Sequence, residues 1–178
     1  MLETRREVDA ARGLTSSLVL LSNGNGVYIF SKNGQCWDYR PDVGLIIAGG
    51  RDTRNVDWST DYGQTKTSIE IPGDYRPGGD LSYACAAIVN TTTVFLAGGA
   101  SPHYTVLSKT YYLNLDTNTW TRGPDLSQAR KGLSCSLMTE PFLGVVMIGG
   151  EKQGGGAVDT VDILNLETNE MATGEEVL

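Results

Sequence analysis

Short apolar runs that end in a pair of glycines recur three times along the chain. They read GLIIAGG at 44–50, VFLAGG at 94–99 and GVVMIGG at 144–150. The second glycines are Gly50, Gly99 and Gly150, so consecutive pairs lie 49 and 51 residues apart. A period near fifty residues is typical of a repeat protein whose units stack or radiate around a centre, rather than of one irregular core.

The runs carry apolar residues at consecutive positions, as in Val145-Val146-Met147-Ile148. A strand at a sheet surface alternates apolar and polar residues, so unbroken apolar strands are expected to be covered on both faces. Four-stranded sheets stacked face to face would provide that cover. Glycine inside a strand costs about 0.5–1 kcal/mol relative to alanine. A pair that recurs three times therefore predicts a required positive φ or close backbone packing.

Each unit is expected to form four antiparallel strands within a single domain. That domain comprises a lead-in and remnant hairpin at 1–33 and units at 34–81, 82–130 and 131–178. The expected strands are 16–21, 27–30, 35–39, 45–48, 67–71, 84–89, 93–97, 111–115, 120–122, 133–138, 145–148 and 161–166, with a weak last strand near Met171. The stretch 51–66 is expected to be one long polar loop. The first unit lacks six residues around Ser82 that the next unit has, which argues against a fourth strand there.

Two octets repeat with the same shift as their glycine pairs. They read LNLDTNTW at 113–120 and LNLETNEM at 164–171, which are 51 residues apart. Residues 116–118 are expected to turn the chain through side chains that bond to their own backbone. Trp120 offers a large apolar area to wedge between neighbouring units. Met171 takes its place in the third unit, and Tyr75 is expected to take it in the first.

An apolar strand with Gly-Gly, a strand bearing Tyr111-Tyr112, a short turn and Trp120, at about fifty residues per unit, resembles the kelch repeat. The resemblance covers roughly residues 34–178. It implies an all-β fold, a β-propeller in which each repeat forms one four-stranded antiparallel blade. This sequence departs from the pattern at Met171 and Tyr75, and its N-terminal hairpin has no glycine pair. Propellers have about four to eight blades, so three units and a remnant predict an incomplete propeller with uncovered apolar end faces.

The formal net charge is −7, which argues against binding to nucleic acid or to an anionic membrane. No segment approaches the roughly 18 consecutive apolar residues of a membrane helix. The N-terminus lacks the apolar core of a signal peptide. We therefore expect a cytoplasmic protein, with a secreted one as the alternative if a leader is missing from this sequence.

Cys36, Cys85 and Cys135 precede the first glycine of each pair by thirteen or fourteen residues. An odd number of cysteines without C-x-x-C spacing suggests neither a disulfide framework nor a zinc site. Their recurrence at one position of the repeat predicts small core residues of inner strands. We expect all three thiols to be reduced and buried.

The familiar chemical motifs are incomplete in this sequence. Gly154-Gly155-Gly156 is not followed by Gly-Lys-Ser/Thr, which favours a flexible loop over a phosphate site. Residues 116–118 lack the glycine and distal glutamate of a calcium loop. The one histidine, His103, cannot form a multi-histidine metal site such as the copper centre of galactose-oxidase-type propellers. Carboxylate-pair chemistry stays open for Asp52, Asp57, Asp61, Glu151 and Asp159, but nothing selects among them. We expect no catalytic residue, no cofactor and no metal.

The loops after the glycine pairs, at 51–66, 100–110 and 151–160, are expected to emerge on one face. Rigid scaffolds usually carry recognition on such variable loops. Trp58 is the most informative residue there, because it either folds back onto its blade or anchors a partner. The candidate protein-binding residues are Arg51, Arg54, Trp58, Tyr62, His103, Tyr104, Lys109, Glu151 and Lys152.

These observations favour a non-catalytic scaffold that binds another, unidentified protein through one propeller face. The resemblance implies roles such as substrate capture in cullin-based ubiquitin ligases or cytoskeletal binding. One alternative is an enzyme acting on a small molecule or sugar, of the epimerase or oxidase type. Another is a degenerate fragment without independent function. Open blade faces would need further blades or self-association to cover them.

Overall fold

The computed structural model describes residues 34–50, 53–61, 65–102 and 105–174, together with the backbone of 19–22 and 27–30. This part of the chain is all-β, as predicted. The strands are β1 (Val19–Ser22), β2 (Val27–Phe30), β3 (Cys36–Arg40), β4 (Gly44–Ala48), β5 (Asn55–Ser59), β6 (Thr67–Glu70), β7 (Cys85–Ile88), β8 (Thr93–Ala97), β9 (Thr110–Asn114), β10 (Thr119–Arg122), β11 (Ser134–Met138), β12 (Gly144–Ile148), β13 (Asp162–Asn165) and β14 (Glu170–Thr173).

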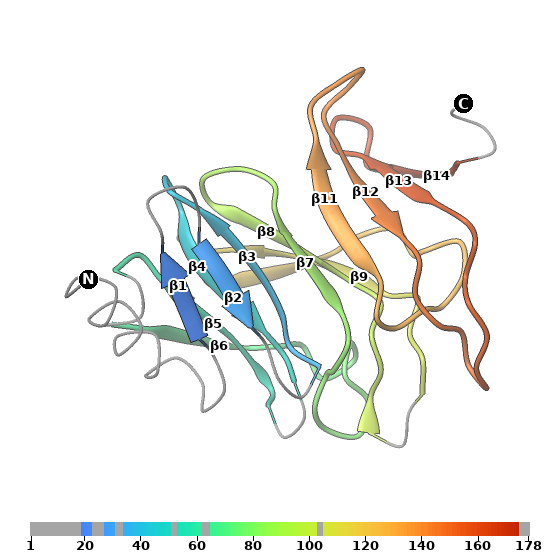
Figure 1. Ribbon diagram of the computed structural model, residues 1–178, viewed down its shortest axis with the longest axis horizontal. Coiled ribbons are helices and arrows are strands. Elements are labelled where there is room, and N and C mark those ends of the chain that lie inside the picture. The colour runs from blue at the N-terminus through green and yellow to red at the C-terminus, as the bar shows by residue number, and fades with distance from the viewer. Residues whose placement is uncertain are drawn as a thin grey trace.

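The strands form three four-stranded antiparallel sheets, each made of strands that follow one another in the chain. The first sheet is β3–β6, the second is β7–β10 and the third is β11–β14, while β1 and β2 pair as a hairpin. The sheets lie side by side in chain order, and the innermost strands β3, β7 and β11 are neighbours (Figure 1). These blade-like sheets have the architecture of an incomplete β-propeller that is not closed into a ring.

Two hydrophobic cores fill the spaces between consecutive sheets. We call the face of a sheet that points toward the next sheet in the chain its leading face, and the opposite face its trailing face. In the middle strands, leading-face residues pack in one cluster with trailing-face residues of the next sheet: Ile46 and Ala48 with Val94 and Leu96, and Phe95 and Ala97 with Val145 and Met147. Consecutive apolar residues in these strands therefore belong to different cores.

The predicted cover on both faces is confirmed for β4 and β8. All of β4 is buried, and β8 is buried from Val94 onward. The same prediction is wrong for β12, where Val146 is half-buried and Ile148 is exposed. The reason is that these two side chains lie on the leading face of the third sheet, and no further sheet follows within the described residues.

The predicted positive φ is found at all six repeated glycines, and the predicted close packing against the next sheet is found in the first two units. All six have positive φ, between 63° and 111°, a region that other residues enter only at a cost. A Cβ on Gly98 would lie 2.5 Å from the Arg130 carbonyl oxygen, and one on Gly49 would overlap the Leu81 carbonyl. Leu81 and Arg130 lead into the next inner strand. The first two pairs therefore let the backbones of consecutive sheets approach closely, whereas a Cβ on Gly149 would meet nothing within 4 Å.

The octets form the expected turns at the end of their sheets. The Asn114 side-chain oxygen accepts the Asp116 and Thr117 N–H groups, both at 3.0 Å. Asn165 makes the equivalent contacts in the third sheet, at 2.8 and 3.1 Å. Asn118 also has a positive φ of 55°. The predicted turn at 116–118 is confirmed, but the side chain that bonds to its backbone is Asn114, which precedes these residues.

Trp120 connects the second sheet to the first, as predicted. Its indole N–H donates to the Glu70 carbonyl at 2.9 Å, and its ring packs against the core between these sheets. Met171 packs at the next inter-sheet core. The expectation that Tyr75 replaces Trp120 is wrong, because Tyr75 lies beyond β6 in the connection to the next sheet. Its buried ring stacks on Tyr111 at 4.9 Å.

The expectation of one long loop at 51–66 is wrong as well. Its middle forms strand β5, which pairs with β4 and with β6, so the first sheet has all four strands. The polar composition misled the prediction because the buried Asp57 carboxylate accepts hydrogen bonds from Ser68 and Lys66. Trp58 lies in β5 and donates its indole N–H to the Val43 carbonyl at 3.1 Å. It folds back onto its own sheet.

Cys85 and Cys135 form a disulfide between β7 and β11, with Cα atoms 5.7 Å apart, so the prediction of three reduced thiols is wrong. Only Cys36 is a free, buried thiol among the described residues. The cause is register. Cys85 pairs with Ala97, which directly precedes its glycine pair, whereas Cys135 pairs with Met147, one residue earlier. A shift of one residue turns a side chain to the opposite face, so Cys135 points back toward Cys85.

Within the described residues, no helix is long and apolar enough to cross a membrane.

Candidate functional site

Strand direction divides the connections between two ends of the sheets. The connections that follow the glycine pairs and those that lead into the inner strands share one end, which we call the rim. The rim comprises the described residues of 34–35, 49–54, 71–84, 98–109, 123–133 and 149–161. The connections at 115–118 and 166–169, with the described residues of 60–66, lie at the opposite end. The three loops were expected to share one recognition face. The described residues of 51–66 that follow β5 lie at the other end of the sheet and cannot belong to that face.

Three residues with left-handed backbone mark the entry to the inner strands. Gly34, Tyr83 and Gly132 each stand two residues before β3, β7 or β11, with φ of 71°, 58° and 66°. The Tyr83 N–H donates to the Gly34 carbonyl at 2.5 Å, and the Gly132 N–H donates to the Tyr83 carbonyl at 2.7 Å. This row of backbone hydrogen bonds ties the three inner strands together at the rim.

Tyr83 stands where both equivalent positions hold glycine. A left-handed conformation costs an ordinary residue about 1–2 kcal/mol, and glycine avoids that cost. The Tyr83 side chain lies over Gly34, where a Cβ would come 3.0 Å from the ring. Nevertheless, 40% of Tyr83 is exposed to solvent. Strain held at an exposed aromatic residue motivates a hypothesis of function.

Two grooves meet at Tyr83. The inner-strand groove has a volume of about 550 Å³ and runs along β3, β7 and β11. The rim groove has a volume of about 350 Å³ and is lined by Tyr83, Lys131, Gly132, Gly150 and Glu151. Both volumes lie within or near the roughly 300–1,000 Å³ of ordinary ligand pockets. Tyr83 is therefore placed to contact anything bound in either groove.

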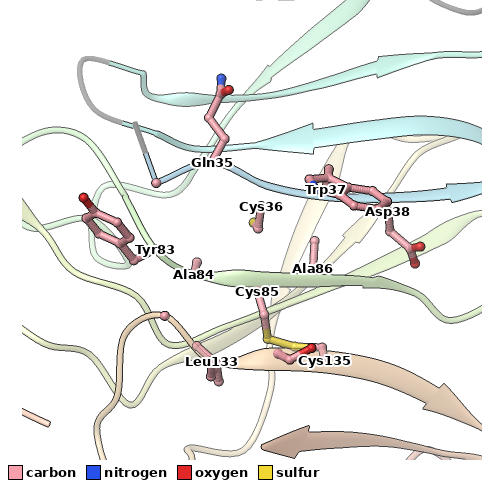
Figure 2. Close-up of a pocket in the computed structure, with 13 residues that line it drawn as sticks. Gln35, Cys36, Trp37, Asp38, Tyr83, Ala84, Cys85, Ala86, Leu133 and Cys135 are labelled. Atoms are coloured by element: carbon pink, nitrogen blue, oxygen red, sulfur yellow. A yellow bond between two sulfur atoms is a disulfide. The ribbon is translucent and has the colours of Figure 1, made fainter. Parts of the chain in front are cut away.

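The inner-strand groove has aromatic ends and a floor of small side chains (Figure 2). Tyr83 stands at one end and Trp37, which is 38% exposed, at the other. Between them lie Cys36, Ala84 and Ala86. Such a groove offers flat apolar surfaces to a ligand or to a partner's side chain.

The sulfur atoms of the groove are chemically quiet. Burial raises the pKa of the Cys36 thiol to about 12, so it stays protonated and a poor nucleophile at neutral pH. The Cys36 thiol also donates to the Ala48 carbonyl at 3.4 Å. Cys85 and Cys135 also line the groove and are joined in the disulfide that Figure 2 shows. The cysteines that line the groove therefore present no thiolate at neutral pH.

Four of the predicted binding residues, namely Arg51, Tyr62, His103 and Tyr104, lie outside the described residues. Of the others, Trp58 is half-buried within the first sheet, away from both grooves. Arg54 and Lys152 are exposed at the rim. Glu151 lies 3.5 Å from the Lys131 ammonium group and lines the rim groove beside Tyr83. Lys109 also lies on the rim, but it contacts Asp74 and not Glu151.

A small polar cluster surrounds Lys109 near the rim. The Lys109 ammonium group donates to the Asp74 carbonyl, and the Tyr111 hydroxyl donates to the Asp74 carboxylate. The Tyr111 hydrogen bond and the Lys109 charge hold the pKa of Asp74 below its ordinary value of 3.8. Burial and the Asp74 carboxylate raise the pKa of Tyr111 to about 12. This cluster joins the connection after β6 to strand β9.

The sequence prediction missed Tyr83 and Trp37. A signal was present, because Gly34 and Tyr83 each stand two residues before one of the repeated cysteines. A tyrosine at a position held elsewhere by glycine could have been singled out on that basis. Trp37 carried no such signal, since its exposure depends on which strand is innermost.

The sequence matches no protein-family model, and no curated protein shows significant similarity to it. Among the described residues, no three His, Cys, Asp or Glu side chains gather where they could hold a metal ion.

Proposed function

We propose that this chain is a non-catalytic, kelch-type module that binds another protein through the rim of its blade-like sheets. The observation that supports the proposal most directly is the exposure of the Tyr83 side chain at the rim. Its aromatic ring is exposed between two grooves, on a backbone conformation that favours glycine. Tyrosine is among the residues that most often supply binding energy at protein interfaces.

The kelch-type assignment rests on the resemblance of the three units to the kelch repeat. The glycine pairs with positive φ, the tyrosine-bearing strand β9 and Trp120 between sheets all have structural roles that a repeated blade requires. Rim connections of unlike sequence, carried on these rigid sheets, are suited to recognition. A cullin-based ligase or the cytoskeleton would supply the kind of partner that the resemblance implies.

The test is an affinity capture from cell extract, compared between the wild-type chain and the variant Tyr83→Gly. Glycine fits the left-handed backbone, so this variant removes the ring without straining the fold. Leu143→Ala serves as the matched control, because Leu143 is similarly exposed (39%) but lies at the end opposite the rim. Quantitative mass spectrometry then compares the proteins recovered.

We expect a reproducible set of proteins with the wild-type chain and with Leu143→Ala, and its loss with Tyr83→Gly. The proposal is contradicted if Tyr83→Gly recovers the same proteins in the same amounts. Comparable thermal unfolding of both variants would show that any loss is local.

A second candidate function is favoured by the inner-strand groove itself. Exposed aromatic rings, such as those of Trp37 and Tyr83, provide apolar faces on which a sugar ring can pack. A thermal-shift screen of mono- and oligosaccharides distinguishes this candidate from protein binding. Stabilisation by a sugar in the wild-type chain, absent in Trp37→Ala, would support it, and no shift with any sugar would count against it.

A further inference from the structure

The leading face of the third sheet is uncovered within the described part of the chain. On this face Ile148 is 52% exposed and Val146 is half-buried. The residues at the position of Ile148 in the other two sheets, Ala48 and Ala97, are buried against the following sheet. A Cβ on Gly149 would meet nothing within 4 Å. The repeat therefore shows what is missing here, namely the trailing face of another blade.

The backbone at the same place shows which part of a blade is missing. In the first sheet the Gly50 N–H donates to the Leu81 carbonyl at 2.6 Å, and in the second the Gly99 N–H donates to the Arg130 carbonyl at 2.8 Å. Leu81 and Arg130 both lead into the next inner strand. Within the described residues, the Gly150 N–H has no counterpart of these carbonyls. By analogy with the first two sheets, the place beside Gly150 would be filled by an inner strand and the segment that precedes it.

The chain contains one more segment with the sequence of such a lead-in. Residues 129–137 read ARKGLSCSL and lead through Arg130 into β11, while residues 11–18 read ARGLTSSL and precede β1. The two segments differ by one inserted residue. By this correspondence, Arg12 stands where Arg130 offers its carbonyl to Gly99.

The hairpin of the same molecule does not occupy this position. In Figure 1, β1 and β2 lie beside the first sheet, at the far side of the arc from β11–β14, with the second sheet between them. A second molecule of the same chain presents the same hairpin without that constraint. An interface of this kind joins unlike surfaces head to tail, and it closes when the rotation brings the last copy back to the first.

We propose that the leading face of β11–β14 binds the N-terminal hairpin, with residues 11–18, of a second copy of this chain. Each copy offers one leading face and one hairpin, so two copies make two identical contacts and close on themselves. Together they supply six four-stranded sheets and two hairpins, within or near the roughly four to eight blades of propellers. The partner that completes the ring is thus the chain itself.

The test measures molar mass in solution by light scattering after size exclusion, using the full chain at micromolar concentration. One variant is Ile148→Glu, which places a charge on the uncovered face. Another is a full-length chain in which residues 11–18 are replaced by alternating glycine and serine. Leu143→Glu is the control, because it adds the same charge at a similarly exposed residue outside the strands.

We expect the wild-type chain and Leu143→Glu to have twice the 19.1 kDa mass of one chain, and both other variants to have the mass of a single chain. Circular dichroism would show that these variants keep their β-structure. A wild-type mass of one chain, or of more than two, overturns the proposal. So does a dimer that survives replacement of residues 11–18, since two copies would then meet face to face through Ile148.

Discussion

The Tyr83 carbonyl accepts a hydrogen bond from the Gly132 N–H at 2.7 Å, and both residues have a left-handed backbone, with φ of 58° and 66°. The geometry belongs to the repeat, because Gly34 has the same conformation at its own inner strand. The aromatic ring belongs to Tyr83 alone. Backbone and side chain at this position can therefore be tested separately.

Replacing Tyr83 by glycine and by alanine separates the two. Both variants lose the ring, but only alanine keeps the cost of the left-handed backbone. We expect Tyr83→Ala to unfold with a free energy about 1 kcal/mol lower than Tyr83→Gly, measured by urea denaturation. Binding to any rim partner should be lost equally in both. Equal stability of the two variants would show that the φ of Tyr83 is not strained.

Alanine substitutions at Gly98 and Gly149 measure how much the close packing between sheets adds to the destabilisation caused by a Cβ at a glycine of the pairs. The two residues have φ of 63° and 71°, so each alanine bears a backbone cost of about 1 kcal/mol. Only at Gly98 does the new Cβ approach a carbonyl, that of Arg130. We expect Gly98→Ala to lower the free energy of unfolding at least twice as much as Gly149→Ala, by thermal or urea denaturation. Equal losses would contradict the close approach.

The disulfide between Cys85 and Cys135 should hold the second and third sheets together. We expect the double variant Cys85→Ser/Cys135→Ser to lose about 2–4 kcal/mol of unfolding free energy. Non-reducing peptide mapping should find these two cysteines linked. Thiol titration should detect no reactive group in the native protein and one, Cys36, after denaturation. Three reactive thiols under denaturing, non-reducing conditions would contradict the pairing.

A disulfide of this kind is typical of oxidising compartments. If peptide mapping of the protein from its natural source finds the Cys85–Cys135 link, the secreted alternative is favoured over the expected cytoplasmic location. The same sample would reveal whether the exposed Asn90 in the sequence Asn90-Thr91-Thr92 carries a glycan.

The bond from Tyr111 to Asp74 should make stability depend on acid pH. It lowers the pKa of Asp74 in the folded chain, so its stabilisation is present above the ordinary value of 3.8 and is lost as pH falls through the lowered pKa. Because Asp74 is largely exposed, the effect should stay below about 1 kcal/mol.

Urea unfolding at about pH 6 and about pH 3 measures this dependence in the wild-type chain and in Tyr111→Phe. We expect the loss between the two pH values to be smaller in the variant. Tyr112→Phe is the control, because its hydroxyl bonds to the neutral Asn169 side chain and its removal should leave the pH dependence unchanged. If Tyr111→Phe lost as much unfolding free energy between the two pH values as the wild-type chain, the Asp74 contribution would be ruled out.

Local sequence was sufficient for most of the fold. Apolar runs such as the one in β8, bounded by Gly98 and Gly99, specify strands and positive φ because both are properties of a few adjacent residues. The turn at Asn114 was predictable for the same reason. The prediction failed at Trp58, where polar neighbours concealed a strand. The Asp57 carboxylate of that strand accepts hydrogen bonds from Ser68 in the next strand and from Lys66 just before it.

The sequence by itself determined a three-unit all-β repeat, its strand hairpins and the wedge position of Trp120, since each follows from periodicity and local backbone preference. The tertiary structure alone decided which faces meet. It turned Cys135 toward Cys85 through a one-residue difference in register. It also left Ile148 uncovered and exposed Tyr83 at the rim. These outcomes depend on how whole sheets pack against one another, which no single stretch of sequence records.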